Sequence, residues 1–138
     1  MMRVHASSVA IGERAVLLFG PSGSGKSDLA LRLIDEGATL VSDDYTELRT
    51  EEGVLRARAP AAIRGRIEVR GLGILPLPCV DDVPVALAVD LDAVVQRLPE
   101  PAARALLDVS VPCVAIDPRT ASAAAKVRLA LGAMALPG

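Results

Sequence analysis

A glycine- and serine-rich segment between two apolar stretches constrains the fold of this chain more than any other feature. Residues 20–27 read Gly-Pro-Ser-Gly-Ser-Gly-Lys-Ser and fit the pattern G-x-x-x-x-G-K-[ST]. The apolar residues 15–20 before it are typical of a strand, and residues 26–36 after it repeat apolar positions at helical spacing. A strand, a glycine loop and a helix in this order predict an α/β fold with a loop that can wrap around an anion.

Each fixed position of this loop, the P-loop, has a chemical reason. Glycines let backbone N–H groups turn inward around phosphate oxygens, and the helix that follows presents the positive end of its dipole. Lys26 adds a mobile positive charge for β- and γ-phosphates, and Ser27 offers a hydroxyl to Mg²⁺. Lys26 is one of only two lysines in the chain, which favours a specific role over a chance Gly/Ser turn that carries a lysine. The predicted nucleotide-binding residues are Gly20, Pro21, Ser22, Gly23, Ser24, Gly25, Lys26 and Ser27.

Two adjacent carboxylates end the next predicted strand. Residues 39–42 are followed directly by Asp43 and Asp44. In a parallel sheet the carboxyl ends of the strands line one crevice, so we expect both aspartates near the phosphates. Because neighbouring strand residues point to opposite faces, one carboxylate can hold Mg²⁺ while the other accepts a proton from an incoming hydroxyl. The alternative is an ordinary polar strand end that leads into a turn.

Two further segments carry candidate site residues. His5 is the single histidine and begins the first predicted strand, residues 4–11. A strand that neighbours the P-loop strand would bring His5 into the same crevice, where it could hydrogen-bond a catalytic carboxylate; a structural or surface histidine is the alternative. Residues 64–75 alternate three arginines and a glutamate with apolar residues. They form either an edge strand with a solvated face or a strand that brings Glu68 and Arg70 beside the phosphates.

The remaining pattern predicts a mixed sheet. Residues 45–49 and 53–58 are typical of a hairpin, residues 84–91 and 112–116 of buried strands, and the alanine-rich tail 120–136 of a helix. The early strand–loop–helix–strand order implies a parallel α/β core, to which the hairpins add antiparallel strands.

Composition excludes several classes of partner. The 138 residues suffice for one compact domain, and 51% hydrophobic residues argue against disorder. A net charge of −2 and only two aromatic residues, Phe19 and Tyr45, disfavour nucleic-acid binding. No apolar run approaches the roughly 20 residues of a membrane helix, and the N-terminus lacks the apolar region of a secretory signal. We therefore expect one cytoplasmic domain over residues 1–138, with no membrane or nucleic-acid partner and with Cys79 and Cys113 as free thiols.

Residues 67–74, Ile-Glu-Val-Arg-Gly-Leu-Gly-Ile, resemble the signature of the HPr kinase/phosphorylase family. His5, the P-loop and the strand end Val41-Ser42-Asp43-Asp44 agree with that family in order and spacing, and the resemblance covers about residues 4–80. The chain looks like a short form that keeps only the C-terminal kinase domain. The implied fold is α/β, a P-loop-containing mixed sheet flanked by helices, similar to the nucleotide-binding fold of phosphoenolpyruvate carboxykinase.

The resemblance implies an ATP- and Mg²⁺-dependent serine kinase that acts on the phosphocarrier protein HPr, or an HPr-like carrier, and so regulates carbon metabolism. It also implies a homo-oligomer and the reverse phosphorylase reaction, in which inorganic phosphate attacks phosphoserine and pyrophosphate is released. Asp43 matches the catalytic base of the family, with His5 orienting it and Lys26 neutralising charge. Ser27 would ligate the metal, which Asp44 and Glu68 would support.

Beyond residue 80 the likeness weakens. Arg119, in the segment Asp-Pro-Arg-Thr at 117–120, is the expected phosphate-facing group there, with a solvated turn arginine as the alternative. Two other functions stay open: a regulatory sensor that binds nucleotide or phosphate with little catalysis, and a small-metabolite kinase. The second requires a lid over its substrate, and no lid-like insertion fits between residues 80 and 120.

Overall fold

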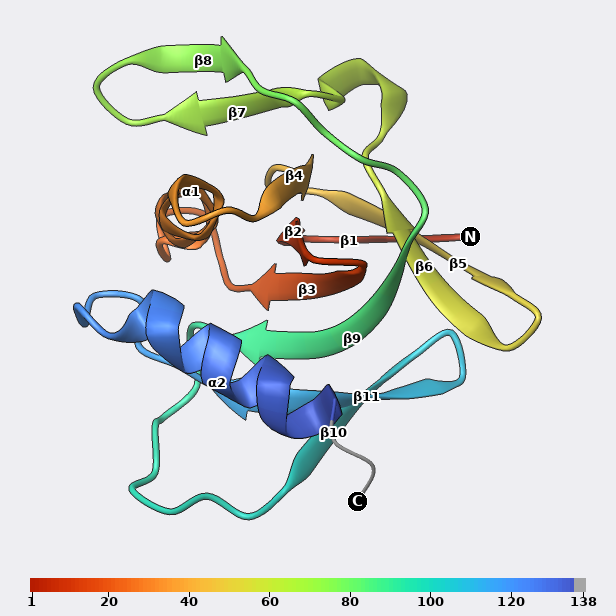
Figure 1. Cartoon of the computed structure of the whole chain (residues 1–138), viewed down its shortest axis with the longest axis vertical. Helices are drawn as coiled ribbons and strands as arrows, with labels where there is room; N and C mark the ends of the chain where they lie inside the picture. The colour runs from red at the N-terminus through yellow and green to blue at the C-terminus, as the bar shows by residue number, and fades with distance from the viewer. Residues whose placement is uncertain (136–138) are drawn as a thin grey trace.

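The computed structural model describes residues 1–135, which form a curled mixed sheet with two α-helices (Figure 1). The main sheet has the strand order β1-β5-β6-β9-β3-β2-β4, and β11 also pairs with β9 and carries β10. Strands β7 and β8 form a separate two-stranded hairpin. The elements are β1 Met2–Val4, β2 Ala6–Ile11, β3 Arg14–Phe19, α1 Lys26–Asp35, β4 Thr39–Ser42, β5 Thr46–Glu51, β6 Val54–Arg58, the 3₁₀ turn Ala61–Ile63, β7 Arg66–Val69, β8 Gly73–Pro76, β9 Val83–Asp90, β10 Ala102–Leu106, β11 Val109–Ala115 and α2 Ala123–Ala135.

The order of the central strands differs from a simple parallel core. Strand β2 lies between β3 and β4 and is antiparallel to both, while β3 and β9 are parallel. Strands β3 and β4 therefore run in the same direction with β2 between them, and their carboxyl ends reach the same edge of the sheet as the start of β2. Asp43 and Asp44, which follow β4, therefore lie at the same edge of the sheet as the P-loop, which follows β3, as expected.

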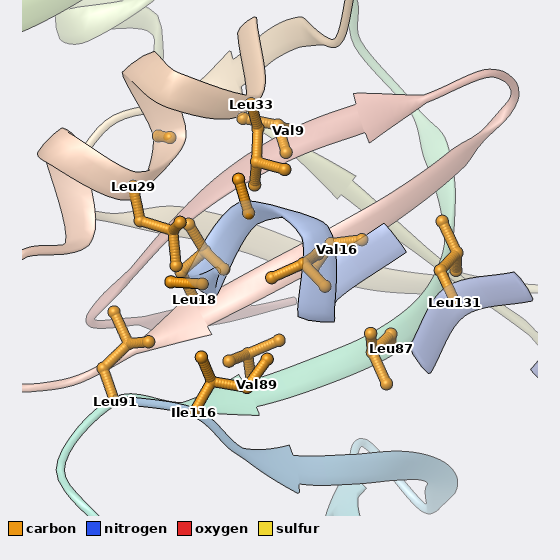
Figure 2. Packing of buried hydrophobic residues seen from close by; sticks show 14 of the residues in the cluster. Val9, Val16, Leu18, Leu29, Leu33, Leu87, Val89, Leu91, Ile116 and Leu131 are labelled. Carbon is orange, nitrogen blue, oxygen red and sulfur yellow. The ribbon is translucent and has the colours of Figure 1, made fainter. Parts of the chain in front are cut away.

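Two apolar clusters fill the two faces of the sheet. The first joins β3 and β9 to both helices, with Leu29 and Leu33 from α1 and Leu131 from α2 against Leu18 and Leu87 (Figure 2). The second contains residues from the strands alone, including Leu17, Phe19, Leu48 and Leu106. Alternation along β3 explains the division, since Leu17 and Leu18 point to opposite faces. Within residues 1–135 both helices pack on the same face, so the expected mixed α/β sheet has its helical layer on one side.

Several element boundaries also differ from the expected ones. The predicted first strand divides at His5 into β1 and β2, and the 64–75 segment forms the β7–β8 hairpin. Strand β10, within the stretch 102–106, was not predicted. Helix α2 begins at Ala123, and the predicted helix end at Leu136 lies outside the described residues.

Candidate functional site

The P-loop joins the end of β3 to the start of α1 and depends on glycine at its last turn. Gly25 has φ of 97°, a conformation that residues with a side chain rarely adopt. A Cβ at this position would also lie 3.2 Å from the Cβ of Pro118, so the turn at 117–120 packs directly on the loop. The left-handed backbone of Gly25 and its close approach to Pro118 therefore both require glycine at this position.

Lys26 is almost fully buried, and its ammonium group is held by the loop that precedes it. The Nζ atom donates to the carbonyl oxygens of Gly20 at 2.7 Å and Pro21 at 3.0 Å. It also lies 3.5 Å from the Oδ1 atom of Asp44. The cation expected to neutralise phosphate charge is thus directly beside one of the two predicted carboxylates.

Asp43 is buried and fully engaged with three different elements. Its Oδ1 atom accepts hydrogen bonds from Ser27 Oγ at 2.5 Å and from Ser7 Oγ at 3.2 Å. Its Oδ2 atom accepts from the backbone N–H of Glu68 at 2.9 Å. The Asp43 carboxylate therefore ties the first turn of α1 to β2 and β7.

Asp44 has a different environment, because its side chain is 45% exposed at the mouth of the site. Its Oδ1 atom lies 2.7 Å from Nε2 of His5. Its backbone is left-handed, with φ of 67°, and its N–H donates to Ser7 Oγ at 2.9 Å. The His5 ring stacks on Tyr45 with centroids 4.8 Å apart. Asp44 is thus oriented by neighbours on both its backbone and its side chain, while remaining open to a reactant.

These residues surround a cavity of about 420 Å³, which we call the phosphate cavity. Its lining brings together most of the predicted site residues: Ser22, Gly23, Gly25, Lys26, Ser27, Asp43, Asp44, Glu68 and Arg70. His5 reaches the site as expected and hydrogen-bonds a carboxylate, but that carboxylate belongs to Asp44 and not to Asp43, which the resemblance implied His5 would orient. Ser7 and Tyr45 were missed by the sequence reasoning. The only signal for Ser7 is a pair of serines, Ser7 and Ser8, inside an otherwise apolar strand.

Arg119 lies outside the phosphate cavity and lines a second cavity that also borders the P-loop. Its guanidinium forms two hydrogen bonds of 3.0 Å with the carboxylate of Asp117. These bonds lower the pKa of Asp117 and raise that of Arg119. The Arg119 side chain is otherwise exposed to solvent, as in the turn-arginine alternative.

The family profile of the HPr Serine kinase C-terminal domain matches residues 1–80. The chain belongs to this family. HPr kinase/phosphorylase of Clostridium novyi is 41% identical over 78 residues, and that of Geobacillus sp. is 48% identical over 73 residues. These matches cover 56% and 52% of this chain. They span only 25% and 24% of the two relatives' own lengths.

A solved structure resembles nearly the whole chain. The Hpr(Ser) kinase/phosphatase from Coxiella burnetii superimposes with a TM-score of 0.84 at 25% sequence identity, covering 96% of this chain and 95% of that one. The likeness therefore extends past residue 80, into the region where sequence similarity to the family weakens. Neither helix in residues 1–135 has the length and apolar character needed to cross a bilayer.

The residues present fit Mg²⁺, the metal that the family implies. The Ser27 hydroxyl and an Asp43 carboxylate oxygen converge within 2.5 Å in the phosphate cavity, and both are hard oxygen donors of the kind Mg²⁺ prefers. In residues 1–135 no cluster of three or more acidic, histidine or cysteine side chains is arranged to hold a metal alone.

Proposed function

We propose that this protein is an ATP- and Mg²⁺-dependent serine kinase of HPr or an HPr-like phosphocarrier. The observation that supports it most is the half-exposed Asp44 carboxylate between His5 and Lys26, beside the P-loop. A kinase site needs bound phosphates, a neutralising cation and a base that the acceptor hydroxyl can reach. The P-loop, Lys26 and Asp44, which would supply these three elements, line one cavity, in a chain whose family and structural neighbour carry HPr kinase names.

We infer that Asp44, rather than Asp43, accepts the proton from the substrate serine. Both oxygens of Asp43 already accept hydrogen bonds from Ser27, Ser7 and Glu68, and its side chain is buried. Asp44 is 45% exposed, and its Oδ1 atom contacts two basic side chains, the His5 ring and the Lys26 ammonium. The serine hydroxyl would donate its proton to Asp44, whose orientation His5 maintains.

The other residues of the cavity bind and orient. Backbone N–H groups of the P-loop and the Lys26 ammonium would hold the phosphates, and Lys26 would exchange its bonds to Gly20 and Pro21 for phosphate oxygens. Ser27 and Asp43 would hold Mg²⁺, which when bound neutralises charge on the β- and γ-phosphates. Glu68, which lines the same cavity, supports the metal in this proposal, and Arg70 contacts phosphate at its edge.

The finer properties of the family extend this proposal. We propose that the whole chain acts as one catalytic domain with a fold related to that of phosphoenolpyruvate carboxykinase, and that it self-associates in the cytoplasm. The phosphorylase reaction uses the same groups in reverse, with protonated Asp44 returning its proton to the serine oxygen as inorganic phosphate takes the phosphoryl group.

The test is phosphotransfer to purified HPr with ATP and Mg²⁺, followed by mass spectrometry of the phosphoserine. The wild-type protein should phosphorylate one serine, and Asp44→Asn should abolish transfer while ADP still binds. Asp43→Asn is the matched variant: it should weaken Mg²⁺-dependent nucleotide binding as well as transfer. Full transfer by Asp44→Asn would reject its role as base. ATP binding without phosphoserine on any HPr-type carrier would reject the kinase and favour the sensor.

A further inference from the structure

A second cavity, of about 580 Å³, meets the phosphate cavity at the P-loop. The two cavities share Gly23 and Gly25. The walls of the second cavity come from residues 91–95, which follow β9, and from residues 117–119, which follow β11. We call it the side cavity. Residues 91–95 and 117–119 both lie beyond the residues that match the family profile, which ends at residue 80.

Hydrogen bonds fix both walls of the side cavity to the central sheet and to α1. The Asp90 carboxylate accepts from the backbone N–H groups of Asp92 and Ala93, at 2.9 and 3.0 Å. On the other wall, Arg32 of α1 donates to the carbonyl oxygens of Pro118 and Thr120. A cavity with anchored walls beside a phosphate loop is of the preformed kind that small ligands occupy, and its volume is within their usual range of roughly 300–1,000 Å³.

The two cavities differ in charge. The phosphate cavity contains the cations of Lys26 and Arg70, whereas Arg119, the cation that lines the side cavity among residues 1–135, is already paired with Asp117. Asp92 adds a carboxylate to the side cavity, with no ion-pair partner within residues 1–135. Phosphate groups therefore favour the phosphate cavity, and a ligand part that enters the side cavity should be uncharged.

The side cavity also exposes aliphatic surface. Leu91, Val94, Val95 and Pro118 contribute to its lining, and Val94 is 86% exposed. Apolar walls with one or two polar groups suit a planar heterocycle with hydroxyl or amino substituents. The Asp92 carboxylate can accept hydrogen bonds from such donors.

We propose that the side cavity receives the nucleoside part of the nucleotide whose phosphates occupy the P-loop, with the base against Val94, Val95 and Pro118. This inference rests on the proposed nucleotide-dependent kinase and gives residues 91–95 a role in nucleotide selection. The proposal predicts that this chain, which has few aromatic residues, binds a nucleotide more tightly than free pyrophosphate, because the base is buried on aliphatic side chains.

The first test compares ADP and pyrophosphate, each with Mg²⁺, by isothermal titration calorimetry. Ala93→Trp fills the side cavity, and Leu98→Trp on the same exposed loop is the matched control outside it. We expect Ala93→Trp to weaken ADP binding by about tenfold or more with unchanged pyrophosphate binding, and Leu98→Trp to change neither. Unchanged ADP affinity in Ala93→Trp, or equal affinity of the wild-type protein for ADP and pyrophosphate, would overturn the proposal.

The second test uses the wild-type chain and so does not depend on how a tryptophan is accommodated. Photolabelling with 8-azido-ADP and Mg²⁺, followed by peptide mass spectrometry, should modify residues within 91–95 or 117–119, and excess ADP should suppress the label. Label that excess ADP suppresses but that lies outside these two segments would overturn the proposal. This result also decides the matter if Ala93→Trp loses the binding of both ADP and pyrophosphate in the first test. Both tests measure binding alone, so a failure to phosphorylate HPr would reject the kinase proposal without deciding this one.

Discussion

The Ser7 hydroxyl joins the two aspartates, and its removal should affect both stability and turnover. Ser7 is fully buried; it donates to Asp43 Oδ1 and accepts from the backbone N–H of Asp44. Ser7→Ala removes both bonds and leaves the Asp44 N–H without its partner. The hydrogen bond to a charged group is worth about 1.5 kcal/mol, and an unpaired N–H costs about 1 kcal/mol or more. We therefore expect a loss of roughly 2–3 kcal/mol in the free energy of unfolding.

This loss can be expressed as a melting temperature. At about 2.1 cal/mol/K per residue, a 138-residue chain unfolds with an entropy near 0.3 kcal/mol/K. Each kcal/mol then shifts Tm by about 3 °C, so Ser7→Ala should melt roughly 7–10 °C below the wild type. Because Asp44 loses the bond that fixes its left-handed backbone, kcat for HPr phosphorylation should fall about 10- to 100-fold.

Ser8→Ala is the matched control on the same strand. Ser8 is equally buried but bonds the Thr46 hydroxyl, which also donates to the Ala6 carbonyl oxygen. Its removal leaves Thr46 with a partner, so the cost should be about 1 kcal/mol, with wild-type kcat. Differential scanning calorimetry gives Tm, and initial-rate phosphotransfer at 20 °C gives kcat. Equal kcat losses in both variants, or wild-type kcat in Ser7→Ala, would refute the reasoning.

Three further predictions follow from packing and charge. Gly25→Ala should destabilise the protein by about 1–2 kcal/mol and weaken pyrophosphate binding, because φ of 97° and the contact with Pro118 oppose a Cβ; wild-type melting and titration curves would contradict this. Arg32→Gln should weaken ADP binding more than pyrophosphate binding by releasing the 117–120 turn, and calorimetry with the two ligands checks it. Burial raises the pKa of the Cys113 thiol. In a Cys79→Ser variant, the rate of Cys113 alkylation by iodoacetamide should therefore still rise with pH where the rate for free cysteine has reached its plateau. A rate profile like that of free cysteine would argue against this.

The local parts of the site were predictable from the sequence because their signals are local. The P-loop pattern, the strand end at Asp43 and Asp44, and the helix over 26–36 each depend on neighbouring residues. The position of His5 in the site followed from the expectation that its strand pairs with the P-loop strand, and β2 does pair with β3. These features agree with the structure in location, while the catalytic roles stay predictions.

Features that depend on long-range pairing were not predictable in the same way. Nothing in residues 6–11 or 39–42 indicates that β2 lies between β3 and β4, and so the partners of His5 and Ser7 could not be assigned. Strand β10 was missed because its alanine-rich sequence has weak strand propensity and forms a strand through pairing with β11. The walls of the side cavity are likewise loops that only the folded sheet brings to the P-loop.

The resting partners of Lys26 have a consequence for which anions the protein selects. Its ammonium group is already satisfied by two carbonyl oxygens and an acid, so an arriving anion gains only the difference between new contacts and those it displaces. A single small anion makes too few contacts to replace these three partners of Lys26. A chain of linked phosphates can contact Lys26 and the loop amides at the same time. We therefore expect linked phosphates to displace the resting partners of Lys26 more readily than chloride or other simple ions, which are abundant in cells.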